Sequence, residues 1–165
     1  MKVFLSGIIT TPYAREFLVK CARLLRAKGF ECYTPCEGGW QRGQVERAEG
    51  ALERDYEALE MADALVAVLD GFTVFDDVAG HIGTFYALMK HRPTKKGIVG
   101  VLHDTRVARW DWAAGPRALN PYIRGCVEER GRVLPSFIQA LAELLRWDGR
   151  EGEPVRVDDI EGGVA

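Results

Sequence analysis

Short apolar runs alternate along the chain with longer segments of helical period. The runs that predict strands cover residues 2–5, 30–34, 64–69 and 98–102, and the segments that predict helices cover 12–28, 44–61, a stretch after 77, and 136–147. Helix-length crossovers between short strands produce right-handed βαβ units and hence a parallel sheet. The alternation therefore predicts an α/β fold of Rossmann-like or flavodoxin-like type: a doubly wound, five-stranded parallel sheet with helices on both faces.

Two segments give this prediction its firmest support. Residues 64–69 are apolar at every position and are bounded by Asp63 and Asp70, as expected for a parallel strand that is covered on both faces. In the first helix, Thr11 precedes Pro12 and Gly29 follows the last periodic residue, which are the residue types preferred at the two ends of a helix. We therefore expect 64–69 inside the sheet rather than at its edge.

Composition limits the class of protein. The chain has 165 residues, 47% hydrophobic and 28% charged, with a net charge of −2 and four cysteines. We expect a single soluble α/β domain over 1–147 and a polar tail over 148–165, which is either disordered or an arm on another subunit. We expect reduced thiols, a cytoplasmic location and no secretory signal, and neither a nucleic-acid polymer nor a membrane as partner.

Ligands of open α/β sheets bind at the carboxyl ends of the strands, and in this chain the loops at those ends contain most of the unusual chemistry. The candidate site residues in these loops are Ser6, Gly7, Trp40, Asp70, Asp76, Asp77 and His81. No dinucleotide-binding glycine motif, P-loop or serine nucleophile elbow is present in the sequence, so these three readings lose their support.

Each candidate also has a purely structural interpretation. Asp76 and Asp77 precede a helix, where carboxylates cap free N–H groups and favour the positive end of the dipole. His81 fits a buried, hydrogen-bonded histidine. A Mg²⁺ site formed by Asp70, Asp76 and Asp77 is a further alternative, although no phosphate-binding motif accompanies it. We expect neither a metal nor a cofactor.

Five sequence pieces occur in the order and spacing of a known family. They are KVFLSG, GFECYTP, ADALVAVLDG, HIGTFYALMK and ALNPYIRG, and they span residues 2 to about 145. Together they resemble the nucleoside 2-deoxyribosyltransferase family. Its members cleave the N-glycosidic bond of 2′-deoxynucleosides and pass the sugar to another base, or to water in the branch that hydrolyses nucleotides.

The resemblance implies roles for particular residues. The family's nucleophilic glutamate falls on His81, which is followed by Ile82 and Gly83. The aspartate that serves the base falls on Phe75, or on Asp76 if one gap is allowed. Asp55 matches another family acid, which helps to orient the site. Asn120 and Tyr122 match a segment that family members lend to a neighbouring active site, so the resemblance implies a homo-oligomer, a dimer or higher.

A histidine at the nucleophile's position is a departure from the family. A carboxylate attacks the anomeric carbon and faces the developing positive charge, whereas an imidazole titrates near neutrality and can instead activate water. Three alternatives stay open: a hydrolase that uses His81 with an aspartate, a transferase whose nucleophile is Asp76 or Asp77, and a protein that binds nucleosides or nucleotides without turnover. We expect cleavage or transfer at the N-glycosidic bond of 2′-deoxynucleosides or their 5′-monophosphates.

Overall fold

Five parallel strands form the central sheet of the chain. The computed structural model describes residues 1–37, 48–71, 73–103, 110–111, 115–116 and 119–155. The sheet strands are β1 (Lys2–Ser6), β2 (Glu31–Tyr33), β3 (Ala64–Val68), β4 (Gly97–Val101) and β7 (Arg132–Leu134). Their spatial order is β2-β1-β3-β4-β7 and every neighbouring pair is parallel. A separate antiparallel pair, β5 (Trp110–Asp111) and β6 (Gly115–Pro116), lies outside this sheet.

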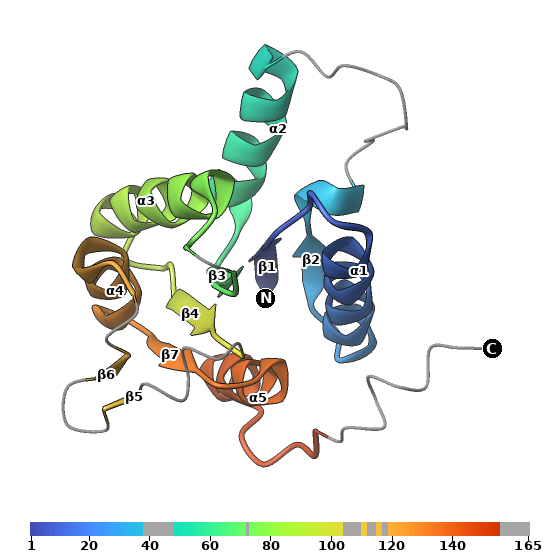
Figure 1. Cartoon of the computed structure of the whole chain (residues 1–165). Helices are drawn as coiled ribbons and strands as arrows, with labels where there is room; N and C mark the ends of the chain where they lie inside the picture. The colour runs from blue at the N-terminus through green and yellow to red at the C-terminus, as the bar shows by residue number, and fades with distance from the viewer. Residues whose placement is uncertain (38–47, 72, 104–109, 112–114, 117–118, 156–165) are drawn as a thin grey trace.

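Helices cover both faces of the sheet (Figure 1). One face carries α1 (Pro12–Ala27) and α5 (Phe137–Trp147), and the other carries α2 (Ala48–Met61), α3 (Asp76–His91) and α4 (Pro121–Glu128). Alternate residues of each strand face opposite layers, so the domain has two apolar cores. The predicted doubly wound, five-stranded fold is confirmed.

The third strand lies in the middle of the sheet, as its sequence predicts. All five residues of β3 are buried, and its Ser6–Ala67 and Val68–Val101 pairs fix the register with β1 and β4. From β1 the chain turns to β2 on one side, and from β3 it turns to β4 on the other. The strand order therefore reverses between β1 and β3, where ligands of such sheets bind.

Gly7 forms the base of this crevice, directly after β1. A Cβ atom at this position would lie 2.6 Å from Leu18 Cδ2 and 3.2 Å from Val68 Cβ. These separations are shorter than ordinary van der Waals contact, so the chain can pass between α1 and β3 here because glycine has no side chain.

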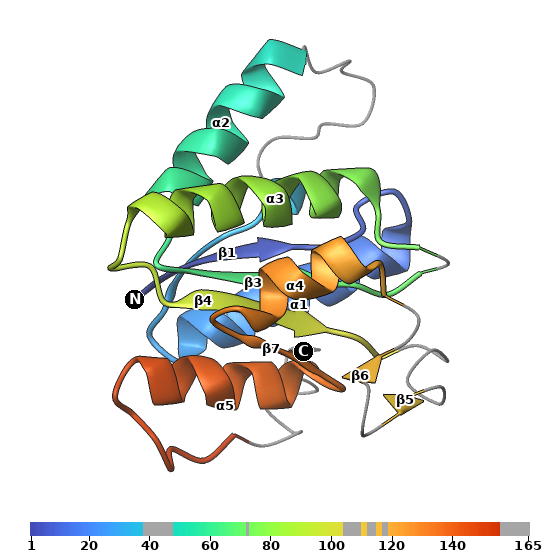
Figure 2. The same ribbon diagram turned by 90° about the vertical axis from the view of Figure 1, so that its left-hand side faces the viewer.

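Several elements differ from the sequence expectation, among them the short pair β5 and β6, which was not predicted. The helix α4 and the strand β7 were not predicted, although the sheet needs β7 to reach five strands. In α2, Leu52 is 71% and Tyr56 44% exposed, although their spacing predicts an apolar face. The reason is visible in Figure 2, where the first turns of α2 extend beyond the layer formed by α3. The predicted helix residues 44–47 lie outside the described residues.

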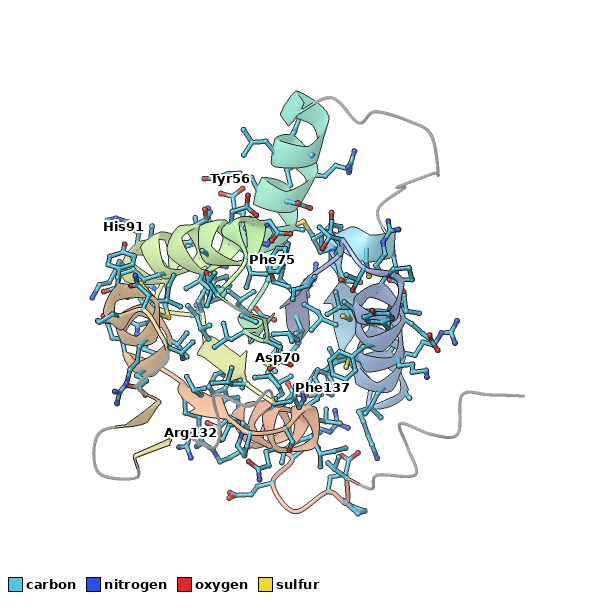
Figure 3. All side chains as sticks on the ribbon, viewed as in Figure 1. Tyr56, Asp70, Phe75, His91, Arg132 and Phe137 are labelled. Atoms are coloured by element: carbon cyan, nitrogen blue, oxygen red, sulfur yellow. The ribbon has the colours of Figure 1, made fainter. Side chains whose placement is uncertain are left out.

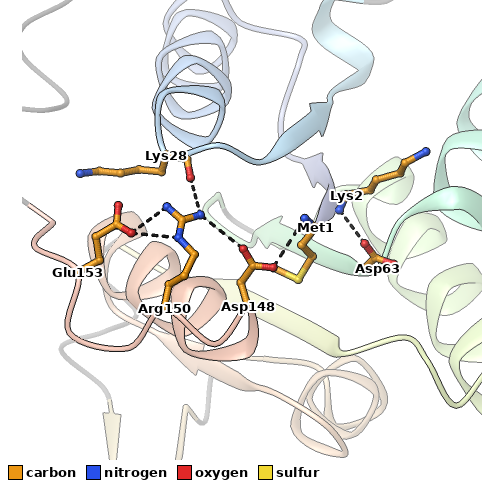
Figure 4. Close-up of polar contacts among 7 residues, drawn as sticks. All are labelled: Met1, Lys2, Lys28, Asp63, Asp148, Arg150 and Glu153. Carbon is orange, nitrogen blue, oxygen red and sulfur yellow. Dashed lines mark hydrogen bonds and ion pairs between the residues drawn. The ribbon is translucent and has the colours of Figure 1, made fainter.

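The polar segment after α5 folds back onto the domain through residue 155 (Figure 4). Arg150 donates a 2.7 Å hydrogen bond to the Lys28 carbonyl and lies 5.5 Å over the Phe30 ring. Lys28 Nζ in turn donates to the Pro154 carbonyl at 3.0 Å. The domain therefore continues past residue 147 to at least 155, while 156–165 lie outside the described residues.

The four cysteines carry no disulfide, and Cys21 and Cys126 are buried. Burial raises the pKa of the Cys21 thiol well above its usual range, so this residue behaves as a small apolar side chain. Within the described ranges, none of the helices has the length and apolar character required to cross a membrane.

Candidate functional site

His81 lies in the second turn of α3, over the carboxyl end of β1. Its Nδ1 atom lies 2.9 Å from Ser6 Oγ, and its Nε2 atom lies 3.5 Å from Asp55 Oδ2. The ring also packs against Phe4, with 4.9 Å between ring centroids. The His81 side chain is 13% exposed, so it is mostly enclosed but borders solvent.

A chain of contacts extends from His81 across four elements. The Tyr33 hydroxyl, from β2, donates a 2.7 Å hydrogen bond to Asp55 Oδ1 on α2. Asp55 then faces His81 on α3, and His81 contacts Ser6 on β1. Ser6 is 1% exposed, so its hydroxyl serves His81 and does not border solvent. We call these four residues the His81 relay.

The relay determines where the ring protons lie. An ionised carboxylate only accepts hydrogen bonds, so the His81 Nε2 atom that faces Asp55 carries a proton. In the neutral ring Nδ1 is then an acceptor, which suits donation from the Ser6 hydroxyl. Both ring nitrogens are therefore already in polar contacts. As it stands, the ring has no lone pair left with which to activate a water molecule.

The pKa values of the two acids beside His81 are shifted in opposite directions. Burial opposes ionisation of Asp55, but the contacts with His81 and Tyr33 outweigh it and lower the pKa of the carboxyl group. Burial raises the pKa of Asp77, against the effects of the Val78 N–H and of His81. Burial and the bond to Asp55 also raise the pKa of Tyr33 to about 12, so Tyr33 stays a donor. Opposed environments of this kind separate an acid from a base in enzyme sites.

Asp76 and Asp77 both occupy the first turn of α3, where they accept backbone hydrogen bonds. Asp76 Oδ1 accepts from the Asp77 N–H at 3.0 Å, and Asp77 Oδ1 accepts from the Val78 N–H at 2.7 Å. The two differ in surroundings, because Asp76 is exposed whereas Asp77 is half-buried. Asp77 is also four residues before His81, which places both side chains on one helix face.

A second histidine–aspartate pair, which the sequence did not indicate, lies on the opposite face of the sheet. Asp70 Oδ1 accepts from the His103 backbone N–H, and Asp70 Oδ2 lies against His103 Nδ1, each at 2.6 Å. The His103 ring meets Phe17 of α1 edge-on, with 5.3 Å between centroids. Figure 3 shows Asp70 on the side of α1 and α5, away from Phe75 on the side of α3.

Two cavities border these groups. A 370 Å³ cleft lies between α2 and the β2 side of the sheet and shares Tyr33 with the relay, but it does not include His81. A 200 Å³ cavity lies at the carboxyl end of β3. Its lining residues are Ile8, Tyr13, Ala14, Phe17, Leu18, Val68 and Asp70. Of these two cavities, the smaller one lies at the switch point, where ligands of such sheets bind.

The remaining predicted residues are placed as follows. Asn120 is the N-cap of α4, and its Oδ1 accepts from the Tyr122 N–H at 2.9 Å. Tyr122 is 66% exposed. Trp40 lies outside the described residues. The described parts of the chain contain no group of three or more His, Cys, Asp or Glu side chains that could hold a metal ion, so the Mg²⁺ alternative gains no support.

Solved structures of other proteins have the same fold. A conserved protein from Enterococcus faecalis V583 is 23% identical, with 89% of this chain and 98% of that chain covered and a TM-score of 0.71. The 2-desoxiribosyltransferase from Leishmania mexicana is 17% identical, with 88% and 97% covered and a TM-score of 0.65. A CMP N-glycosidase from Clostridium botulinum is 17% identical, with 89% and 99% covered and a TM-score of 0.56.

These structures share the fold at low identity, and the search of curated proteins gives no match. The sequence itself carries the assignment. The family model described as nucleoside 2-deoxyribosyltransferase matches residues 3–136. Apart from Lys2, this range includes all five strands of the sheet, and it includes every member of the His81 relay. The chain belongs to the nucleoside 2-deoxyribosyltransferase family.

Proposed function

We propose that the protein cleaves the N-glycosidic bond of 2′-deoxynucleosides or their 5′-monophosphates, and that the relay with Asp77 is the reacting site. The observation that carries the proposal is the geometry around His81, whose Nε2 lies 3.5 Å from Asp55 Oδ2 and which shares a helix face with Asp77. The surroundings lower the pKa of Asp55 and raise that of Asp77. The family supports an activity on small nucleoside substrates. The fold it shares with a CMP N-glycosidase supports hydrolysis as one outcome.

In this mechanism each acid has one task. Asp55, held ionised by Tyr33 and His81, faces the positive charge that develops on the sugar as the C1′–N bond breaks. The electron pair of that bond goes to the base, and Asp77 gives the base nitrogen a proton. Water or a second base then bonds to C1′, and Asp77 recovers a proton from it. We assign this role to Asp77 rather than to Asp76. Asp76 is exposed, and because it is five residues before His81 it does not share the helix face of His81 as Asp77 does.

His81 acts as a positioning residue in this mechanism. Its Nε2 proton orients Asp55, and the Ser6 hydroxyl fixes the ring. These contacts also favour a second candidate function, which is binding without turnover. The resemblance places His81 where the family has its glutamate, and both nitrogens of the His81 ring already contact Asp55 or Ser6. We propose that the reaction uses no cofactor. We further propose a cytoplasmic homo-oligomer in which Asn120 and Tyr122 approach a neighbouring site.

The experiment incubates the protein with deoxynucleosides and their monophosphates, with and without a second free base, and follows bases by chromatography. Released base supports hydrolysis and exchanged base supports transfer. Asp55→Asn and Asp77→Asn should each lower turnover roughly 100-fold or more, while Glu53→Gln, an exposed change on α2, should leave it unaltered. Saturable binding without either product would refute catalysis, and a larger loss in Asp76→Asn than in Asp77→Asn would refute the assignment of the acid.

A further inference from the structure

The two histidines at the carboxyl edge of the sheet are held in different ways. His81 uses Nδ1 for Ser6 and Nε2 for Asp55. His103 uses Nδ1 for Asp70, and within the described residues its Nε2 makes no hydrogen bond. Since the Asp70 carboxylate only accepts, the His103 Nδ1 atom carries the proton. The Nε2 atom of the neutral ring is therefore an acceptor with no partner among the described residues.

Asp70 fixes this arrangement firmly. Both of its oxygens bind His103, one through the backbone N–H and one through the ring, each at 2.6 Å. A carboxylate on one nitrogen of an imidazole sets the tautomer and leaves the other nitrogen to a substrate in many enzyme sites. The contact with Phe17 fixes the plane of the His103 ring from the side of α1.

The adjoining cavity has walls suited to a small ring. Phe17 and Asp70 belong both to the His103 contacts and to the cavity lining, which otherwise is made of apolar groups and Tyr13. His103 itself is not a lining residue, so its ring adjoins the cavity through Phe17 and Asp70. Tyr13 is 78% exposed at the start of α1, so an aromatic face stands open beside the cavity. At 200 Å³ the space is below the roughly 300–1,000 Å³ of pockets for drug-sized ligands. It therefore suits one ring rather than a whole nucleoside.

The charges around the cavity further restrict the class of ligand that it can bind. Asp70 is the charged residue of this cavity lining, and the described lining residues include no Lys or Arg. A phosphate group would meet a carboxylate and apolar walls, which disfavours it. An uncharged ring that carries an O–H or N–H can donate to His103 Nε2 and pack its faces on the aromatic side chains.

We propose that His103 and the cavity beside Asp70 form a second subsite of the crevice, which binds an uncharged ring bearing an O–H or N–H donor. His103 contacts the ligand and Asp70 is its positioning residue. The sugar ring and the edge of a free nucleobase share this chemistry. The choice between these two ligands rests on the proposed function, whereas the subsite itself rests on the contacts of His103, Asp70 and the cavity.

Long-range ¹H–¹⁵N NMR of the labelled protein tests the subsite without any turnover, because the chain has three histidines. His91→Gln and His103→Gln assign the signals. At pH 8, where an ordinary imidazole is neutral, we expect His103 protonated on Nδ1 and His81 protonated on Nε2. Asp70→Asn should shift part of the His103 population to the other tautomer, since an amide can also donate.

Titration then identifies the ligand. The probes are 2-deoxyribose, cytosine, adenine and inorganic phosphate. A neutral ring should move the His103 Nε2 signal, and the probe that does so distinguishes sugar from base. His103→Gln and Asp70→Asn should weaken that binding roughly 3- to 10-fold. His91→Gln should leave it unchanged, because His91 is exposed at the last turn of α3 and lies apart from Asp70 in Figure 3.

The subsite is overturned if His103 is protonated on Nε2, if no neutral ring moves its signal, or if phosphate moves it more than the rings do. These outcomes are independent of the proposed function. Binding at His103 in a protein that releases no base would refute catalysis alone, whereas base release with an unresponsive His103 would refute the subsite alone.

Discussion

Replacement of the buried Lys95 by methionine should destabilise the protein, because this lysine completes the end of α2. Lys95 is 5% exposed, and its Nζ donates to the carbonyls of Leu59, Glu60 and Ala62 at 3.0, 3.1 and 2.5 Å. The ammonium also lies 4.7 Å from the Phe85 ring centroid. These carbonyls belong to the last turn of the helix and the residue after it, where backbone acceptors lack helical partners.

The cost follows from the acceptors left without a donor. The Asp63 N–H, which would bond Leu59 in a longer helix, donates instead to the Lys2 carbonyl at 2.8 Å. Glu60 keeps a second donor, Arg92 Nη1, at 3.2 Å. Methionine therefore leaves the carbonyls of Leu59 and Ala62 without this donor, each at a cost of about 1–3 kcal/mol. Burial lowers the pKa of Lys95, which means that the buried charge itself costs stability. Because methionine removes that charge, part of the cost of the two unpaired carbonyls is offset, and we expect a net loss of about 3 kcal/mol.

Urea unfolding and thermal unfolding, each followed by circular dichroism, measure this loss. A destabilisation of about 3 kcal/mol lowers the melting temperature by roughly 6–12 °C in a domain of this size, with an unchanged denaturant slope. The control is Lys96→Met, an exposed neighbour, which should stay within about 0.5 kcal/mol of the parent. A Lys95→Met protein within 1 kcal/mol of the parent would show that water or other donors satisfy these carbonyls, contrary to the reasoning.

Three further predictions use other parts of the molecule. Tyr33→Phe removes the donor to Asp55, so the pKa of Asp55 rises and the acid limb of the pH–rate profile moves to higher pH; a profile with an unmoved acid limb counts against the relay. Gly97→Ala places a Cβ 1.9 Å from the Arg130 carbonyl oxygen at a φ of +155°, so we expect the free energy of unfolding to fall by roughly 3 kcal/mol or more. Unfolding in urea close to that of the parent would contradict this. Light scattering at micromolar concentration should give an oligomer, reduced in size by Tyr122→Ala, and a monomeric parent would end that proposal.

Local patterns predict the elements of this fold well where burial is uniform. The strand β3 is apolar throughout because both of its faces are covered, and such a strand looks the same in any parallel sheet. In α2, by contrast, the local pattern does not predict burial correctly. The spacing of Leu52 and Tyr56 indicates an apolar stripe but not whether anything packs on it, and both residues are exposed. The missed helix α4 had a local signal, since Asn120 before Pro121 is an N-cap followed by a proline at the first position.

Three of the four relay residues were candidates from the sequence, whereas Tyr33 was not, and the sequence did not predict how the four contact one another. Ser6 and His81 are 75 residues apart, and their contact depends on the register of β1 with β3 and on how α3 sits over it. No spacing in the sequence contains that information. His103 was missed for the same reason, since its role depends on a contact with Asp70, which follows the neighbouring strand β3. The loops at the strand ends pointed to Ser6 and His81, the resemblance added Asp55, and only the packing shows the contacts that define their chemistry.

The strand order has a consequence for how the chain acquires its structure. The central strand β3 must pair with β1, which precedes it by some sixty residues, and β4 stays half-paired until β7 (Arg132–Leu134) is in place. Such distant parallel pairings form slowly, because chain entropy is lost before contacts compensate for it. During synthesis, a nascent chain that ends before residue 132 exposes the apolar β4 as an open edge. We expect that intermediate to need a chaperone or to aggregate, and refolding to become efficient only once β7 is present.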